Sequence, residues 1–223
     1  MRCARHCRQR VVRPAHTGCA AIGHSCRTSL VSDVSVLPEC LWTVGHSNLE
    51  WSAFVALLRA WRIEAIADVR RFPGSRRHPW FASEAMATAL PDAELDYQWL
   101  PELGGRRRPR PGSPNGAWRN AAFQGYADHL DSAEFAVGLA KLLAVATRRR
   151  TALMCAEVLW WRCHRRLIAD LLVARGVEVE HILDPVHVQT HVLHPDAQGD
   201  GERLIYPPRQ RGLFEVAPAN RAG

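Results

Sequence analysis

Apolar residues along this chain form short runs and longer stretches with helical spacing. The short runs, some of them interrupted by polar residues, predict strands at residues 41–44, 63–69, 95–100, 151–155 and 177–183. Apolar positions three and four residues apart predict helices at residues 49–61, 83–90, 125–147 and 164–175. The third helix has a candidate break at Asp131-Ser132. Strands that alternate with helices in this way are typical of a mostly parallel sheet.

We therefore expect an α/β fold: a single domain with a mostly parallel open sheet and helices on both faces, Rossmann-like but without a dinucleotide fingerprint. A chain of 223 residues is long enough for one such domain and its core. Ser47 and Glu50 have the spacing of a capping box, which predicts the start of the first helix. Pro91 predicts the end of the second helix. No apolar run approaches the roughly 18 residues of a membrane-spanning helix, so we expect no membrane partner.

The two ends of the chain lack these patterns. Residues 1–40 are rich in Arg, Cys and His, and we expect a disordered extension or a start assigned too far upstream. The α/β domain is expected over residues 41–214, followed by a disordered tail over residues 215–223. An alternative for the N-terminal segment is a zinc site, although the spacing of its ligands matches no usual zinc finger. The candidate ligands are Cys3, His6, Cys7, Cys19, His24 and Cys26.

Composition adds a basic charge and free thiols to this picture. The formal net charge is +7, and 28 of the 29 basic residues are arginine, a side chain that suits phosphate and carboxylate ligands. GC-rich coding also explains an excess of arginine, so charge alone does not establish a nucleic-acid partner. The seven cysteines are an odd number, and no apolar segment follows the N-terminal arginines as in a signal peptide. We therefore expect a cytoplasmic protein with reduced cysteines.

Chemically active residues follow each of the first four predicted strands. They are, in chain order, His46, Asp68, Arg70, Arg71, Glu102, Cys155 and Glu157. Because open parallel sheets bind ligands beyond the carboxyl ends of their strands, we expect these residues to share one site. His46, the three carboxylates and Cys155 are the candidate catalytic groups, and the two arginines are candidate anion ligands. The alternatives are structural: a helix cap at His46, an ion pair of Asp68 with Arg70, and a solvated Glu102.

The segment from Cys155 to Arg165 joins a predicted buried strand to the start of a helix. A helix N-terminus attracts anions, and Arg162, His164 and Arg165 would add hydrogen-bond donors there. A cysteine in such a field has a lowered pKa and reacts as a thiolate, which makes Cys155 a candidate nucleophile. However, six residues separate Cys155 from Arg162, and the cysteine phosphatases have five. The alternatives are a plain buried Cys155 and a redox pair of Cys155 with Cys163.

An arginine-rich loop with interleaved aromatic residues follows the third predicted strand. Arginine and aromatic side chains together suit phosphate contacts and base stacking. The candidate nucleic-acid-binding residues are Arg106, Arg107, Arg108, Trp118 and Tyr126, and the candidate anion ligands next to them are Arg119 and Asn120. The alternative is a solvated loop that binds nothing.

Five motifs in fixed order carry a family resemblance. They are Thr43-Val-Gly-His-Ser47, Asp68-Val-Arg-Arg-Phe-Pro73, Leu100-Pro-Glu-Leu-Gly-Gly105, Trp118-Arg-Asn120 with Phe123 and Tyr126, and Met154-Cys-Ala-Glu157 with Cys163-His-Arg165. Together with the tail pieces His191-Val-Leu-His194 and Leu204-Ile-Tyr206, they resemble the family catalogued as domain of unknown function 488, from about Leu41 to Phe214. The resemblance implies a compact α/β domain of the bacterial cytoplasm. The family's name carries no activity, so the resemblance implies no substrate.

These observations favour an enzyme that acts on a phosphate-bearing ligand, either a phosphorylated small molecule such as a nucleotide, or a nucleic acid. The anion would be held by Arg70, Arg119, Arg162 and Arg165. His46 or Asp68 would serve as the general acid or base, and Glu157 would orient it or act as a second carboxylate.

Three alternatives remain open. One is a non-catalytic nucleic-acid-binding domain that uses the arginine-rich loop. Another is a metal-dependent nuclease or hydrolase with Asp68, Glu102 and Glu157 as oxygen ligands, so a divalent metal is an optional cofactor. The last is a thiol-redox role of Cys155 and Cys163. Beyond these options, the sequence assigns no metal ligands and no oligomeric state.

Overall fold

The computed structural model describes residues 37–74, 76–199 and 202–209. A six-stranded sheet runs through its centre in the order β3-β2-β4-β1-β5-β6. The parallel strands are β1 (Cys40–Gly45), β2 (Ala65–Asp68), β3 (Asp96–Trp99), β4 (Thr151–Cys155) and β5 (Glu178–Ile182). At one edge, β6 (Val188–Thr190) runs antiparallel to β5. β7 (Gln198–Gly199) and β8 (Leu204–Ile205) form a separate antiparallel pair.

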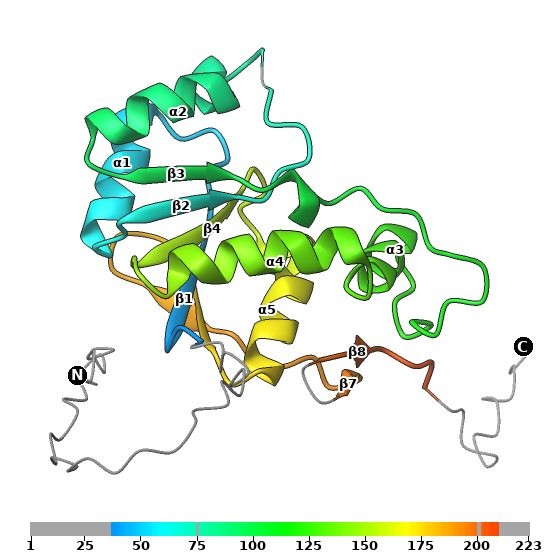
Figure 1. Ribbon diagram of the computed structural model, residues 1–223. Helices are drawn as coiled ribbons and strands as arrows, with labels where there is room; N and C mark the ends of the chain where they lie inside the picture. Colours follow the sequence, from blue (N-terminus) through cyan, green and yellow to red (C-terminus); the bar gives the residue numbers. More distant parts are fainter. Residues whose placement is uncertain (1–36, 75, 200–201, 210–223) are drawn as a thin grey trace, which may run out of the picture.

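Helices cover both faces of the sheet (Figure 1). α1 (Trp51–Ala60) and α2 (Ser83–Asp92) pack on one face, with the short 3₁₀ helix η1 (Pro79–Phe81) beside them. α3 (Ala121–His129), α4 (Ala133–Ala146) and α5 (Arg165–Ala174) pack on the other. Two further 3₁₀ turns, η2 (Pro101–Leu103) and η3 (Trp160–Arg162), follow β3 and β4. None of the helices in the described part of the chain combines the length and apolarity needed to cross a bilayer.

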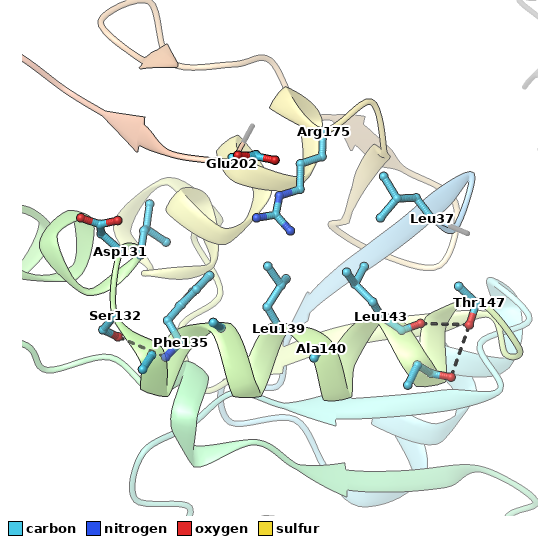
Figure 2. Close-up of a pocket in the computed structure, with 14 residues that line it drawn as sticks. Leu37, Asp131, Ser132, Phe135, Leu139, Ala140, Leu143, Thr147, Arg175 and Glu202 are labelled. Carbon is cyan, nitrogen blue, oxygen red and sulfur yellow. Dashed lines mark hydrogen bonds between the residues drawn. The ribbon is translucent and has the colours of Figure 1, made fainter. Parts of the chain in front are cut away.

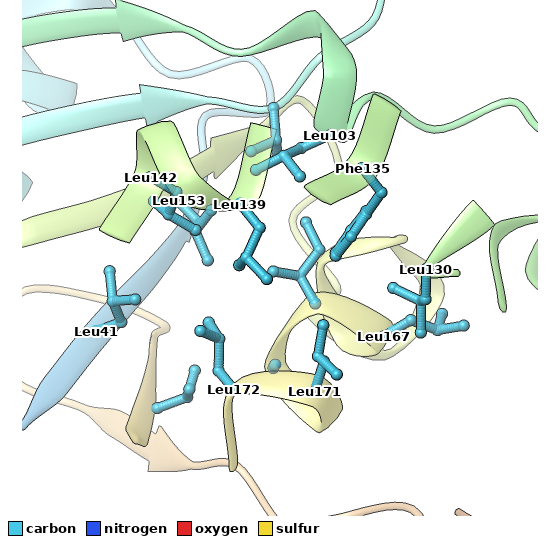
Figure 3. Close-up of a cluster of buried hydrophobic side chains, with 14 of the residues drawn as sticks. Leu41, Leu103, Leu130, Phe135, Leu139, Leu142, Leu153, Leu167, Leu171 and Leu172 are labelled. Atoms are coloured by element: carbon cyan, nitrogen blue, oxygen red, sulfur yellow. The ribbon is translucent and has the colours of Figure 1, made fainter. Parts of the chain in front are cut away.

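Each parallel strand sends alternate side chains into two separate cores. In β1, Leu41 packs in the core beneath α4 and α5, whereas Trp42 and Val44 pack beneath α1 and α2. Figure 3 shows Leu41 of β1 with Leu139 and Leu142 of α4 in the first of these cores. Because β1, β2 and β4 are buried on both faces, they are nearly continuous apolar runs, and this is why they could be located in the sequence.

The predicted fold class is confirmed: the described residues form one mostly parallel open sheet with helices on both faces. The predicted strands all occur, each within two residues of its predicted ends. The helix predicted over residues 125–147 is two helices, and Ser132, at the predicted break, caps α4 by accepting a hydrogen bond from Phe135 N. Strands β6, β7 and β8 were not predicted, because segments of two or three residues are too short to show a period.

Two predictions about helix ends are wrong. Ser47 does not cap α1: its backbone has a φ of 47°, its hydroxyl donates to Asn48, and the N-cap is Glu50 with no side-chain cap. Pro91 does not end α2 but lies in its last turn, which continues to Asp92. The expectations for residues 1–36 and 210–223, including the N-terminal zinc site, lie outside the described residues.

Gly45 at the end of β1 gives a test of this packing. A Cβ atom at this position would lie 2.2 Å from the carbonyl oxygen of Glu157 and 2.7 Å from the Cα of Val158. Gly45→Ala must therefore displace the backbone between β4 and α5, and we expect a loss of about 1–3 kcal/mol in the free energy of unfolding, measured with urea.

Gly74 is the matched control, because a Cβ atom there would meet nothing within 4 Å. Gly74→Ala should change the free energy of unfolding by less than about 0.5 kcal/mol. If Gly45→Ala were as stable as Gly74→Ala, the close approach of the two segments would be wrong.

Candidate functional site

The predicted site residues gather at the carboxyl ends of the parallel strands but divide into two clusters. The first cluster lies on the α1–α2 side of the sheet, where Asp68 and Arg70 follow β2 and His46 follows β1. The second lies on the α5 side, where β4 ends at Cys155 and α5 begins after Cys163. The sheet therefore separates groups that the sequence placed in a single site.

In the first cluster, Asp68 and Arg70 form a buried ion pair. The Arg70 Nε donates to Asp68 Oδ1 over 2.8 Å, and a second guanidinium nitrogen donates to Oδ2. The Tyr97 hydroxyl also donates to Oδ2 over 2.8 Å, and the Arg70 guanidinium touches the sulfur of Met86. The Trp99 indole holds the Arg70 backbone by donating to its carbonyl oxygen. The structural alternative for this pair is therefore realised, and both side chains are bonded within the protein.

His46 is a neutral part of the same cluster. Its Nδ1 lies 3.0 Å from the carbonyl oxygen of Ser47, which can only accept, so Nδ1 carries the hydrogen and Nε2 accepts from Arg70 over 3.1 Å. The ring stacks on Phe81, with centroids 3.9 Å apart. Burial, followed by the positive charge of Arg70, lowers the pKa of His46 to about 4. With both nitrogens occupied, His46 orients Arg70 rather than facing a ligand.

The second cluster brings both cysteines and an imidazole together. Cys163 is buried, and its Sγ lies 3.6 Å from His164 Nδ1 and 3.3 Å from the Nε of Arg165, which donates to it. Cys155 Sγ lies within 4.8 Å of both Cys163 Sγ and a ring nitrogen of His164. His164 donates from Nε2 to the carbonyl oxygen of Val69 over 2.9 Å, so its Nδ1 is left as an acceptor. Both cysteines are free thiols.

The pKa values of the two thiols shift in opposite directions. Burial by itself raises the pKa of Cys163, but the hydrogen bond from Cys155 and the nearby His164 and Arg165 reverse this effect and hold the pKa well below its ordinary value. The same hydrogen bond, together with burial, raises the pKa of Cys155. Cys163 is therefore the more acidic thiol of the pair, and the cluster can act as a nucleophile, a redox pair or a set of metal ligands.

A buried line of hydrogen bonds fixes Arg165 next to Cys163. Arg165 Nη1 donates to the hydroxyl of Thr43 over 3.2 Å, and Thr43 donates to His181 Nδ1 over 2.7 Å. His181 Nε2 then donates to His191 Nδ1 over 2.9 Å, and His191 Nε2 donates to a carboxylate oxygen of Asp170 over 2.9 Å. The line of bonds runs from the guanidinium donor of Arg165 at one end to the carboxylate acceptor of Asp170 at the other. Burial lowers the pKa of His181 strongly.

Asp170 also holds the C-terminal part of the described chain. It accepts hydrogen bonds from the backbone N–H of His194 over 2.8 Å and from the Tyr206 hydroxyl over 2.9 Å. The tail motifs at residues 191–194 and 204–206 therefore meet at one buried carboxylate on α5.

The predicted carboxylates do not form a shared metal site. The oxygens of Asp68 are bonded to Arg70 and Tyr97, Glu102 is paired with Lys141, and Glu157 accepts from the backbone N–H of Leu159. Within the described residues, the group of three whose donor atoms could hold a metal is instead made of Cys155, Cys163 and His164.

Several residues predicted to bind nucleic acid are structural. Tyr126 is buried and its hydroxyl donates to the carbonyl oxygen of Leu103, so it offers no face to a base. Trp118 stacks on Phe123, with centroids 5.0 Å apart. Asn120 caps α3, and Arg107 pairs with Glu134. Of the predicted anion and nucleic-acid ligands, the exposed residues are Arg106, Arg108, Arg119, Asn120 and Arg162.

An exposed aromatic side chain that was not among the predicted site residues lies at this end of the sheet. Phe72 follows β2, is 67% exposed, and has the guanidinium carbons of Arg71 and Arg106 at 5.8 and 5.9 Å from its ring centroid. Trp99 at the end of β3 and Trp161 after β4 are also exposed. The motif Asp68-Val-Arg-Arg-Phe-Pro73 contained the signal, because a Phe next to two arginines in a loop has no helix or strand face to pack against.

Packing connects this aromatic side chain with the thiol cluster. A Cβ atom on Gly104 would lie 2.7 Å from the Cβ of Arg71, and one on Gly105 would lie 2.9 Å from His164 Nδ1. The two glycines therefore let one loop pack against Arg71 on one side and His164 on the other. In Figure 1 the arrowheads of β2 and β3 point towards the side of the molecule where this loop runs.

The large cavity drawn in Figure 2 lies elsewhere. It has a volume of about 810 Å³ and is lined by Leu139 and Leu143 of α4, with Leu37, Arg175 and Glu202 opposite (Figure 2). None of the predicted site residues lines it. Its size alone therefore gives no reason to place the chemistry there.

Comparison with known proteins identifies the family. The model of the domain of unknown function DUF488 matches residues 50–172, more than half of the chain. The chain belongs to the DUF488 family. No curated protein and no solved structure matches it. The DUF488 match runs from the start of α1 to the last turn of α5, so it includes the thiol cluster, Phe72 and the loop between them.

The neutral state of His46 makes stability depend on pH. The pKa of about 4 lies below the ordinary value of 6.5, so between these values the unfolded chain binds a proton that the folded protein does not. The free energy of unfolding therefore falls as the pH falls from 6.5 towards 4. We expect urea unfolding of the wild type to lose about 1.4 kcal/mol more per pH unit than that of His46→Gln in this range.

His187 is the control for this measurement, because it is exposed. His187→Gln also removes an exposed ion pair with Asp184, so it shows how much an exposed histidine changes the slope. That change should be smaller than the one produced by His46→Gln. Equal slopes for the wild type and His46→Gln would contradict the neutral, buried state of His46.

Proposed function

We propose that this protein is an enzyme that acts on a phosphate-bearing ligand, a nucleotide or a nucleic acid, at the carboxyl ends of its parallel strands. The observation that carries the proposal is the position of Phe72, an exposed ring with the guanidinium groups of Arg71 and Arg106 beside it. The loop at Gly104 and Gly105 packs against Arg71 on one side and against His164 of the thiol cluster on the other. An exposed aromatic face stacks on a base, and flanking arginines bind the phosphates of the same ligand.

The charges at this end of the molecule support an anionic ligand. Arg106, Arg108 and Arg162 are exposed and have no carboxylate partner within the described residues. The guanidinium groups of Arg70 and Arg165, by contrast, are buried and donate their hydrogen bonds to other groups of the protein. Arg71, Arg106 and Arg162 therefore replace Arg70 and Arg165 as the proposed anion ligands.

The thiol cluster supports catalysis rather than binding alone. Cys163, His164 and Arg165 are held by buried hydrogen bonds next to the proposed ligand surface, and a binding surface needs no such arrangement. The free thiols would be kept reduced in the cytoplasm, which is the compartment we propose for this enzyme.

A non-catalytic nucleic-acid-binding domain is the second candidate, because the exposed Phe72 and arginines would bind single strands without the thiols. His164→Asn distinguishes the two. If the protein is an enzyme, this variant should keep the affinity of the wild type for the ligand but fail to convert it, as followed by chromatography of the incubated nucleotide or oligonucleotide. A wild type that binds but converts neither ligand would favour the second candidate.

Replacement of Phe72 tests the ligand surface. We expect Phe72→Ala to weaken binding of a fluorescein-labelled single-stranded oligonucleotide by about five- to a hundredfold, because one stacked base is lost. The change is measured by fluorescence anisotropy, with ADP as a competitor to test a single nucleotide. Arg71→Ala and Arg106→Ala should also reduce the salt dependence of binding, since each removes one phosphate contact.

The controls are residues of the same type that lie on helices. Val137 on α4 is an exposed apolar side chain and Arg59 on α1 is an exposed arginine, so Val137→Ala and Arg59→Ala should bind as the wild type does. Unchanged affinity of Phe72→Ala for both the oligonucleotide and ADP would overturn the proposed ligand surface.

A further inference from the structure

The thiol cluster has the donor geometry of a metal site. Cys155 Sγ, Cys163 Sγ and a ring nitrogen of His164 all lie within 4.8 Å of one another. The 3.6 Å between Cys163 Sγ and His164 Nδ1 equals the sulfur-to-nitrogen edge of about 3.6 Å around a tetrahedral zinc ion with bonds of about 2.3 and 2.1 Å. We propose that Cys155, Cys163 and His164 bind one divalent cation of the zinc class and leave its fourth coordination position open.

The imidazole is oriented as a ligand should be. His164 Nε2 donates its hydrogen to the carbonyl oxygen of Val69, so the lone pair of Nδ1 is directed away from that bond and towards the sulfur atoms. A backbone carbonyl that fixes the second nitrogen of a histidine is the usual support of a metal-bound imidazole. The loop at Gly105 lies against the same ring, where a Cβ atom would be 2.9 Å from Nδ1, so the glycine keeps the space next to this nitrogen free.

The sulfur ligands have a support of their own. The Nε of Arg165 donates to Cys163 Sγ over 3.3 Å, and the hydroxyl of Thr43 and the carbonyl oxygen of Glu157 hold the rest of that guanidinium. Two thiolates and one imidazole nitrogen favour Zn²⁺ over Mg²⁺ or Ca²⁺, which prefer oxygen ligands. This donor set differs from the three carboxylates expected from the sequence.

The charge of the site selects the fourth ligand. A divalent cation and two thiolates are neutral together, and the guanidinium of Arg165 adds one positive charge. An anion is therefore favoured at the open position, either hydroxide formed from a bound water or an oxygen of a phosphate group. This role of the open position rests on the proposed function, whereas binding of the ion does not.

The test is a titration of the reduced, metal-free protein with Co²⁺, which reports sulfur ligands by charge-transfer absorption and four-coordination by strong visible bands. The full chain carries Cys3→Ser, Cys7→Ser, Cys19→Ser and Cys26→Ser, so that the N-terminal cysteines cannot contribute. We expect one Co²⁺ per chain, displaced by one Zn²⁺. Absence of both absorption features in this folded protein would overturn the proposal.

Variants of the ligands locate the ion. Cys155→Ser, Cys163→Ser and His164→Asn should each weaken Co²⁺ binding by about tenfold or more. Cys40→Ser should not, since Cys40 lies at the opposite end of β1 from the cluster. Circular dichroism of each variant identifies any that fail to fold. Unchanged affinity in a folded ligand variant would overturn the assignment of that residue.

Alkylation gives a second measurement, in which none of the three ligand residues is mutated. Zn²⁺ should protect Cys155 and Cys163 from iodoacetamide at least tenfold, as mapped by mass spectrometry, and should leave the labelling of Cys40 unchanged. Equal labelling with and without Zn²⁺ would show a thiol pair rather than a metal site.

Inorganic phosphate examines the open position separately. Added to the Co²⁺-loaded protein, it should shift the visible bands. Tight Co²⁺ binding with no response to phosphate would support the metal site but contradict phosphate as its fourth ligand.

Discussion

The arrangement around the thiol cluster depends on the burial of one cation. The side chain of Arg165 is 1% exposed, and within the described residues its acceptors are a sulfur, a hydroxyl and a backbone carbonyl, none of them a carboxylate. A buried guanidinium is costly unless its donors are satisfied and its charge is compensated. Because the acceptors belong to β1, to the loop after β4 and to Cys163, Arg165 fixes three segments relative to one another.

The compensating negative charge lies at two places. Cys163, which carries the lowered pKa, is in direct contact with the guanidinium. Asp170 lies at the far end of the line of hydrogen bonds through Thr43, His181 and His191. This line of hydrogen bonds connects α5 with β1, with β5 and with His191 after β6. The position of the segment after β6 is therefore linked to the position of Arg165 next to Cys163.

At the carboxyl ends of the strands, the two faces of the sheet carry two different clusters of polar residues. On one face, Asp68, Arg70 and His46 form a closed, neutralised cluster that holds the loop carrying Arg71 and Phe72. On the other face, the donor atoms of Cys155, Cys163 and His164 lie close enough together to hold a metal ion. The proposed ligand surface and the proposed metal site are therefore supported by separate sets of buried bonds, and the loop through Gly104 and Gly105 connects them.

The sequence by itself determined the strands, the helices and the end of the sheet where the polar residues gather. The central strands β1, β2 and β4 are buried on both faces and are therefore nearly continuous apolar runs, and the direction of parallel strands brings the ends of β1 to β5 to one edge. Only the tertiary structure decided which of these residues bond to one another. Asp68 and Cys155 end neighbouring strands, yet side-chain alternation turns them to opposite faces of the sheet. Partners such as Asp170 and His191 are far from the strand ends in the sequence, and they meet because folding brings distant segments into contact in a dry interior where every polar group needs a partner.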